Sequence, residues 1–310
     1  MTMKIGANSQ IIQEISNGPL QAGEVDLIEL SMKHSGILNE TIDYDRLEEI
    51  YSLNTSFSIH APCTGYRYPG TSIDFGLRDE RNFRVMEDVF QIASYLDAEY
   101  VIVHGDKVNG DHRGSFLNLI YNLTHLSKMA EEYSLTLLLE NLHNKNGFER
   151  MGIKPMELLQ IIRLVNRDNL KIVFDVGHGN LTANQHNFDI LEFFDYLSPY
   201  IYHMHIHDNI GIPAFMGPGY GDQHLPIGHG NIDFNRIFRR IKETKTKNLV
   251  LELKTNSRED AMKSIGILKD FRDGELRKNA FKDSGFIAVK EIGDGIVDLD
   301  TPLEAEAIKI

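Results

Sequence analysis

The chain has 310 residues, of which 42% are hydrophobic and 25% are charged, so it has enough apolar surface for a full core and is not expected to be disordered. Its net charge of -13 excludes a broad basic surface of the kind that gives non-specific affinity for nucleic acids. The single cysteine, Cys63, excludes an internal disulfide and a thiolate metal site, so any metal must be held by His, Asp and Glu.

No stretch of the chain approaches the ~18 uncharged apolar residues that a membrane-spanning helix needs. Residues 1–8 lack the apolar region and cleavage site of a secretory signal peptide. We therefore expect a cytoplasmic protein that has no membrane partner. The sequence carries no signal for the oligomeric state.

Short apolar runs rich in Val, Ile and Leu alternate with helical-period segments, which is typical of βα units around a parallel sheet. The expected strands are residues 3–8, 25–30, 56–60, 100–104, 136–140, 171–175, 201–207 and 249–253. The expected helices are residues 10–16, 44–51, 81–96, 114–133, 155–165, 188–197, 235–243 and 258–271. This alternation predicts an α/β fold, a (β/α)8 TIM barrel over residues 1–272 as a single domain. Residues 273–310 form a short C-terminal extension without an assigned role.

An open doubly wound sheet gives the same alternation, so a flavodoxin-like or Rossmann-like fold is the second interpretation. The lack of a G-x-G-x-x-G motif after an early strand disfavours it. Two connections are long, residues 61–77 and 208–233, and both contain Gly and Pro. Loops of this length on a barrel are usually lids or binding loops.

Six successive expected strands end in a potential metal ligand. In chain order these residues are His60, His104, Glu140, Asp175, His205 and Glu252. A single His or Glu at a strand end is usually just a hydrogen-bonded or exposed residue. In a barrel, however, all six side chains converge on one bowl, where buried carboxylates and imidazoles need compensating cations. The mixed nitrogen and oxygen donors favour Zn²⁺ or Mn²⁺.

Three more residues complete a known pattern: His178 follows Asp175, and Asp222 and His224 lie in the loop after the seventh strand. Together the set resembles endonuclease IV, in the superfamily of xylose isomerase-like TIM barrels, over roughly residues 3–271. The resemblance implies nine ligands for three metal ions, namely His60, His104, Glu140, Asp175, His178, His205, Asp222, His224 and Glu252. In this scheme Glu140 bridges the ion of His60 and His104 to a second ion on Asp175, His205 and Glu252. The remaining three residues hold the third ion.

The sugar isomerase and epimerase branch of the same superfamily is also similar to this chain. That branch implies a single metal ion on Glu140, Asp175, His205 and Glu252, and this smaller set is complete here too. The first and last of these carboxylates would then move protons between adjacent carbons of the substrate. The five other residues of the larger set therefore distinguish the two branches, and all five are present.

The sequence thus favours a metal-dependent phosphoester hydrolase, in which two to three ions about 3.5–4 Å apart activate water for attack on a phosphate ester. The candidate catalytic residues are Glu140 and Glu252, which hold the metals around the nucleophile. The alternative is a sugar or sugar phosphate isomerase or epimerase, in which the same two residues are acid and base beside a carbonyl. A third, non-enzymatic interpretation is a barrel that binds a ligand and keeps the metals for its structure.

The expected substrates are a small phosphoester or sugar, or damaged DNA such as an abasic site. The loop after His60 lacks the Tyr-Leu pair with which endonuclease IV enters the base stack, and weak binding to long undamaged DNA is expected. Four further histidines lie near the ligand positions: His143, His203, His207 and His229. Because strands have a period of two, His203 and His207 share a face with His205. Glu29 and Lys254 are expected at most to contact substrate.

Overall fold

A closed barrel of parallel strands forms the centre of the computed structural model, which describes residues 2–31, 33–34, 37–38, 41–63, 73–145 and 148–276. The order around the barrel is β1-β10-β9-β8-β7-β6-β5-β2. These strands are β1 (Lys4–Asn8), β2 (Leu27–Ser31), β5 (Ser56–His60), β6 (Tyr100–His104), β7 (Thr136–Glu140), β8 (Leu170–Asp175), β9 (Ile201–Ile206) and β10 (Asn248–Leu251). The predicted (β/α)8 barrel is confirmed, and the doubly wound alternative is wrong because the sheet closes on itself.

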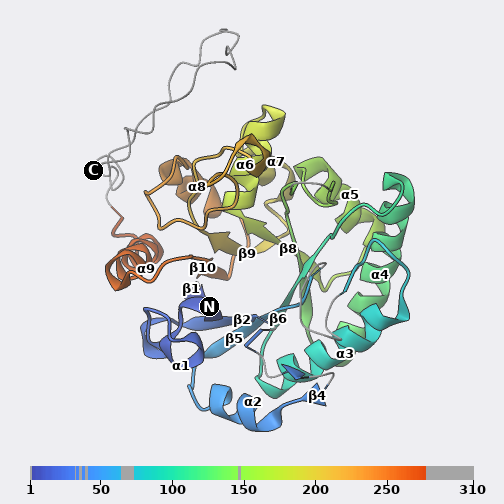
Figure 1. Cartoon of the computed structure of the whole chain (residues 1–310), viewed down its shortest axis with the longest axis horizontal. Helices are drawn as coiled ribbons and strands as arrows, with labels where there is room; N and C mark the ends of the chain where they lie inside the picture. Colours follow the sequence, from blue (N-terminus) through green and yellow to red (C-terminus); the bar gives the residue numbers. More distant parts are fainter. Residues whose placement is uncertain are drawn as a thin grey trace.

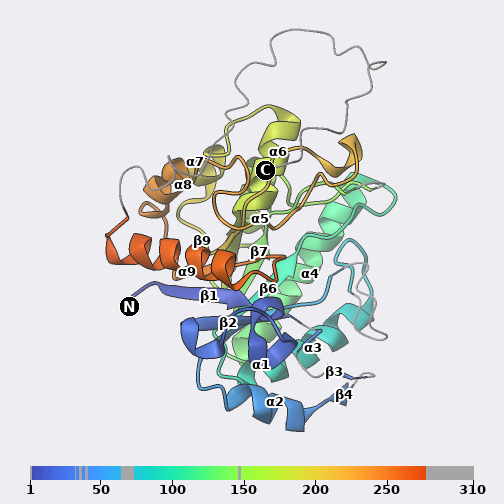
Figure 2. The same ribbon diagram turned by 60° about the vertical axis from the view of Figure 1, so that its left-hand side comes forward.

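Helices surround the barrel on its outside (Figure 1). They are α1 (Gln13–Ser16), α2 (Tyr44–Tyr51), α3 (Glu80–Tyr95), α4 (His112–Glu132), α5 (Pro155–Val165), α6 (Val176–His186), α7 (Glu192–Leu197), α8 (Phe234–Ile241) and α9 (Arg258–Asp273). Several begin at an acidic residue whose side chain accepts a backbone N–H of the first turn, as Asp79 does for α3 and Asp111 for α4. Figure 2 shows α9 alongside β1, where it closes the ring between the last and the first strand.

The strands form here because their side chains are buried on both faces, as Val101, Ile102 and Val103 of β6 are. The pairing register then sets the site. His104 lies opposite Glu140 across the β6–β7 pair, and Asp175 lies opposite His205 across β8–β9. Residues from neighbouring strand ends are thus brought to the same rim, as the barrel pattern predicts.

The structure differs from the sequence prediction mainly after β8. The expected loop at residues 176–187 is the helix α6, and the expected helix at 188–197 shortens to α7, which starts at Glu192. The first expected helix, 10–16, is split into a 3₁₀ turn (Ser9–Ile11) and α1. Two short strands were not predicted, β3 (Ile37–Leu38) and β4 (Thr41–Ile42). The eighth barrel strand ends at Leu251, so Glu252 lies just beyond it.

The connection between β9 and α8 is closed on itself by backbone pairing of Asp208 with Leu225, each donating to the other at 2.8 Å. The side chain of Asp208 accepts backbone N–H groups from four residues of this connection, at distances of 2.9 to 3.2 Å. The carboxylate of Asp208 therefore holds together the loop that carries Asp222 and His224. A side chain at Gly230 would overlap Asp208, so this close approach requires glycine.

Part of the other long connection, residues 64–72, lies outside the described residues, as do residues 277–310 of the expected C-terminal extension. The described barrel ends with α9 at Asp273, where Gly274 adopts a positive φ and terminates the helix. The division into a barrel and an extension at residues 272 and 273 stays a prediction. None of the helices in the described ranges is long and apolar enough to cross a membrane.

Candidate metal centre

Three carboxylates surround one histidine nitrogen at the rim of the barrel. The Nδ1 atom of His205 lies 3.7 Å from Glu140 Oε1, 3.7 Å from Asp175 Oδ2 and 3.6 Å from Glu252 Oε1. His205 is fully buried, and within the described part of the chain this nitrogen has no hydrogen-bond partner. Four ligands at metal bonds of about 2.0–2.2 Å lie about 3.3–3.6 Å apart in a tetrahedron. Ligand atoms of Glu140, Asp175 and His205 all lie within 4.8 Å of one another, which suits one divalent ion, and Glu252 Oε1 also approaches His205 Nδ1.

The electrostatics of this set also call for a cation. Burial alone would lower the pKa of His205, but the surrounding carboxylates outweigh it and hold the pKa well above its usual range. Burial would likewise raise the pKa of Glu140, yet the neighbouring histidines hold it well below its usual range. The cluster thus stabilises a positive charge at its centre, which a bound metal ion supplies without a proton.

A second group adjoins the first through Glu140. Its Oε2 atom lies 3.3 Å from His60 Nε2 and 3.0 Å from His104 Nε2, and the two ring nitrogens are 3.2 Å apart. Burial lowers the pKa of His104 to about 4, whereas Glu140 raises that of His60 to about 9 against the effect of burial. The sequence-predicted cluster of His60, His104 and Glu140 is therefore assembled in space, with Glu140 between the two groups.

A third group lies on the other side of the bowl. His178 Nε2 lies 3.6 Å from Asp222 Oδ2, and His224 Nε2 lies 2.7 Å from the same oxygen. His143 joins this group, since ligand atoms of His143, His178 and Asp222 all lie within 4.8 Å of one another. Both His143 Nε2 and Asp222 Oδ1 are buried and lack a hydrogen-bond partner among the described residues.

The other ring nitrogen of each of these histidines indicates which nitrogen is free for a metal. A backbone carbonyl lies within hydrogen-bond distance of Nδ1 in His60, His143, His178 and His224, on Ala61, Asn144, Asn141 and Glu252 respectively. A neutral ring that donates from Nδ1 keeps an unprotonated Nε2, which is the arrangement usual for metal-binding histidines. His224 also adopts a φ of 50°, a left-handed conformation that is uncommon outside glycine.

Sequence reasoning missed the part that His143 and Glu29 play. His143 lies three residues after Glu140, in the loop after β7, and no strand-end rule selects that position. Glu29 was expected only as a substrate contact; it lines the small pocket, and its carboxylate also lies between His203 and His205 inside the barrel. The shared strand face of His203 and His205 was a usable signal for that arrangement. His229, in contrast, lies outside the site, 3.7 Å from Asp260.

A small pocket opens beside the central group. Its volume is about 180 Å³, and Asn8, Gln10, Ser31 and Lys254 line it together with His60 and Glu252. A larger cavity of about 690 Å³ lies beside α5, but none of the nine predicted ligands lines it. The smaller pocket is therefore the one that belongs to the site, and most of the residues that line it have polar side chains.

Residues 24–271 match the family model of xylose isomerase-like TIM barrels. Two proteins of Methanocaldococcus jannaschii are similar to the chain. Uncharacterized protein MJ1311 is 33% identical over 202 residues, which is 64% of this chain and 64% of that protein. The match thus spans less than two thirds of that relative's own length. Uncharacterized protein MJ1614 is 27% identical over 282 residues, covering 86% of this chain and 99% of that protein.

Two solved structures are also similar to this chain. The crystal structure of a D-tagatose 3-epimerase-like protein is 28% identical, with a TM-score of 0.69 over 88% of this chain and 98% of that one. The crystal structure of IolI protein with a bound zinc atom has a TM-score of 0.67 at 19% identity and covers 89% of this chain and 99% of that one. The second of these shows likeness of fold alone.

Proposed function

Since the chain belongs to the family of xylose isomerase-like TIM barrels, we propose that it is a metal-dependent isomerase or epimerase that acts on a small sugar or sugar phosphate. One observation carries the proposal. The buried, unpartnered Nδ1 of His205 lies 3.6 to 3.7 Å from one oxygen of each of three carboxylates, which fits a single divalent ion, Zn²⁺ or Mn²⁺.

When bound, such an ion polarises a carbonyl and the adjacent hydroxyl of a substrate, which makes the C–H bond beside the carbonyl more acidic. Oε1 of Glu252 lies towards His205. The side chain of Glu252 is 13% exposed and lines the pocket. It is thus placed to remove the proton from carbon. Asn8 and Ser31 line the same pocket and would contact the substrate there.

Glu140 is the second proton-transfer group in this proposal. It lies on β7, which β8 and β9 separate from β10, so the two carboxylates approach the centre from different directions. Its Oε2 is engaged with His60 and His104, and His60 lines the pocket. In the proposal these two histidines orient the Glu140 carboxylate, which exchanges a proton with the substrate on its side of the centre.

The size of the pocket supports a small substrate. At about 180 Å³ it is smaller than the ~300–1,000 Å³ typical of sites for drug-sized ligands. Its polar side chains suit a polyhydroxylated molecule. The D-tagatose 3-epimerase-like protein, which is 28% identical, adds support for epimerase chemistry, and the zinc in IolI protein adds support for a metal.

A phosphoester hydrolase resembling endonuclease IV is the second candidate. The observation that favours it is that His60, His104, His178, Asp222 and His224 also lie together around the central group. Additional ions at these residues would orient a phosphate and activate water. Catalysis by Glu140 and Glu252 is common to both candidates, so neither residue distinguishes them.

The test uses solvent deuterium. Protein reloaded with Mn²⁺ or Zn²⁺ is incubated in D₂O with a panel of ketoses, aldoses and their phosphates, and products are followed by NMR. The proposal expects deuterium at the carbon beside the carbonyl, and loss of this exchange in Glu252→Gln, which keeps the size of the side chain. Phosphoester cleavage together with no exchange on any sugar would replace the proposal with the hydrolase.

A further inference from the structure

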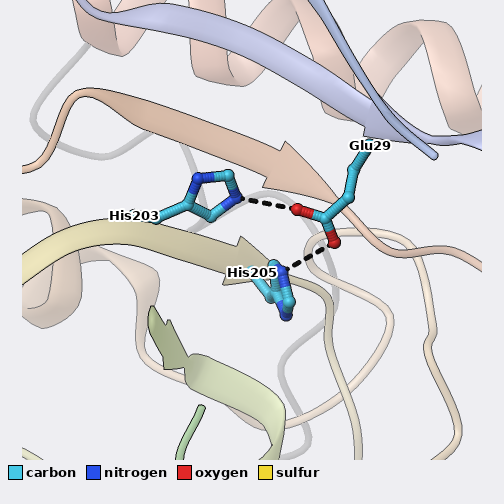
Figure 3. Close-up of side chains that lie close together, drawn as sticks. All are labelled: Glu29, His203 and His205. Atoms are coloured by element: carbon cyan, nitrogen blue, oxygen red, sulfur yellow. Dashed lines mark ion pairs between the residues drawn. The ribbon is translucent and has the colours of Figure 1, made fainter. Parts of the chain in front are cut away.

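Glu29, His203 and His205 form a buried cluster beside the candidate metal centre, and Glu29 also lines the small pocket. Glu29 points from β2 to the two histidines of β9, and each of its oxygens faces one ring (Figure 3). Glu29 Oε1 lies 2.9 Å from His205 Nε2, and Oε2 lies 3.1 Å from His203 Nε2. We propose that Glu29, together with His203, is a positioning residue that orients His205 for metal binding. The proposal rests on the central metal site of the proposed function.

The orientation of His205 follows from the chemistry of imidazole. A ring nitrogen that binds a metal must be unprotonated, and a neutral ring then carries its proton on the other nitrogen. Nδ1 of His205 faces the three carboxylates of the centre, so the proton belongs on Nε2. Nε2 faces Glu29 Oε1, and a carboxylate is an acceptor only. Glu29 therefore selects the tautomer that leaves Nδ1 free for the ion.

The tautomer of His203 is fixed from its opposite side. Asn248 Nδ2, which is a donor, lies 3.3 Å from His203 Nδ1, so Nδ1 accepts and Nε2 carries the proton towards Glu29. The hydroxyl of Ser58 donates to Glu29 Oε2 at 3.1 Å. The buried carboxylate thus accepts one hydrogen bond from Ser58 and lies at ion-pair distance from two ring nitrogens, which offsets its loss of hydration.

The same three residues have the spacing of a metal site, so a second ion there is the competing interpretation. It conflicts with the central site, because His205 would have to bind one ion through each nitrogen and lose both ring protons. If Glu29 instead accepts the ring proton of His205, the arrangement of Glu29, His203 and His205 is explained without that conflict.

Loss of Glu29 would leave the N–H of His205 without an acceptor in a dry interior. The ring would then gain by rotating or by moving its proton to Nδ1, and either change removes the ligand atom from the centre. Removal of a group that orients a metal-binding histidine typically lowers metal affinity by about 10–100-fold. The effect on affinity distinguishes positioning from a contribution to folding alone.

The experiment measures Zn²⁺ affinity by competition with a chelator in wild type, Glu29→Leu, Glu29→Gln and Ser58→Ala. We expect Glu29→Leu to bind about 100-fold more weakly, and Glu29→Gln to recover about tenfold of that loss, since its carbonyl still accepts from His205. Ser58→Ala is the matched control, because it removes a donor to Glu29 and touches neither histidine. Its affinity should stay close to that of wild type.

Ring ¹⁵N NMR of histidine-labelled protein supplies a readout independent of activity. In wild type and Glu29→Gln, loading with ¹¹³Cd²⁺ should couple the metal to His205 Nδ1 while Nε2 keeps its proton. A Glu29→Leu variant that binds Zn²⁺ as tightly as wild type, with only a lower unfolding temperature in the metal-free state, would overturn the positioning role. If Glu29→Leu does not fold, unchanged affinity and coupling in both Glu29→Gln and a Glu29→Asp variant overturn it equally.

Failure of the central site gives a different pattern. Glu252→Gln should weaken Zn²⁺ binding, and no effect of that substitution would mean that the proposed metal site itself is wrong. If Glu252→Gln weakens binding but changes at Glu29 do not, only the positioning role fails. Zn²⁺ that persists in Glu252→Gln and disappears in Glu29→Leu would show that the ion binds at Glu29 instead, which also overturns the inference.

Discussion

At the scale of single residues, the hydrogen-bond partner of one ring nitrogen of a histidine determines whether the other ring nitrogen is free to bind a metal ion. His178 keeps Nε2 towards Asp222 because Nδ1 lies 3.0 Å from the carbonyl of Asn141. His205 has the opposite orientation: its Nε2 faces Glu29, and its Nδ1 faces the carboxylates of the candidate metal centre. These orientations depend on partners from other strands, so the ligand identities could be predicted from the strand ends whereas the tautomers could not.

His143 gives a pH-dependent prediction for metal-free protein. Burial lowers the pKa of His143 from 6.5 to about 3. Because the folded pKa lies below the unfolded one, the stability contributed by the neutral ring is present above about pH 6.5. It is lost as the pH falls towards about 3. In this window the unfolded chain binds the extra proton, so the free energy of unfolding should fall by up to about 1.4 kcal/mol per pH unit.

Urea unfolding of chelator-treated protein at pH 7 and pH 5.5 measures this effect. His143→Gln keeps a polar side chain but removes the titrating ring, so its free energy of unfolding should fall less steeply with acid than that of wild type. Equal slopes for the two proteins would show that His143 is not held neutral by burial.

Asp222 and His224 separate the two candidate functions. Under the proposed isomerase, which has one central ion, changing both to Ala should leave that ion and sugar-dependent deuterium exchange in place. Under the hydrolase, the same change should lower the number of bound ions by about one and reduce phosphoester turnover at least ~10²-fold. Metal analysis and both activity assays on one preparation give the comparison. Loss of the central ion in the double variant would contradict the separation of the groups.

At the scale of elements, the strands could be predicted because continuous apolar runs have few alternatives in a chain of this length. Helix α6 could not. Its residues from Val176 to Ala183 are all buried, so it lacks the polar face that marks a surface helix, and Gly177 and Gly179 weaken its helical propensity. The helix is fixed by tertiary contacts. Gly177 leaves room for the ring of His207, where any side chain would overlap it.

Asp175 links this helix to the site. Its Oδ1 caps α6 by accepting from the backbone N–H of His178 at 2.6 Å, while Oδ2 faces His205 at 3.7 Å. A strand end, a helix start and a metal ligand thus coincide in one side chain. The sequence marked Asp175 as a ligand, and the cap fixes the backbone of His178 three residues later.

The β9–α8 connection yields a prediction at the same scale. In Asp208→Asn an amide nitrogen replaces one carboxylate oxygen and faces buried backbone N–H groups of the loop, so the stability of the fold should fall by at least about 2 kcal/mol. Hydrogen exchange at Gly228 and Gly230 should accelerate. Because Asp222 and His224 lie in this loop, ions bound there should be lost before the central ion.

Asp233→Asn is the matched control for that change. Asp233 lies at the end of the same loop, and its side chain accepts from Arg236 N at the start of α8, where Asn caps about as well as Asp. Its effect on stability and on exchange at Gly228 should be small. Equal effects of the two substitutions would mean that Asp208 does not organise the connection.

At the scale of the whole molecule, barrel closure produces the site. Ligands separated by more than a hundred residues along the chain, such as His60 and Glu252, meet because β5 and β10 belong to one ring. The convergence could be predicted from the sequence, since the fold places every strand end at one rim. The choice between isomerase and hydrolase could not, because both chemistries use the same central residues.

The most direct test of the account is anomalous diffraction from crystals of the protein loaded with Zn²⁺ or Mn²⁺. The account predicts a strong peak about 2.0–2.3 Å from His205 Nδ1 and from one oxygen each of Glu140, Asp175 and Glu252. An ion found only at other residues, with His205 Nδ1 bonded to a carboxylate in fully loaded protein, would contradict it.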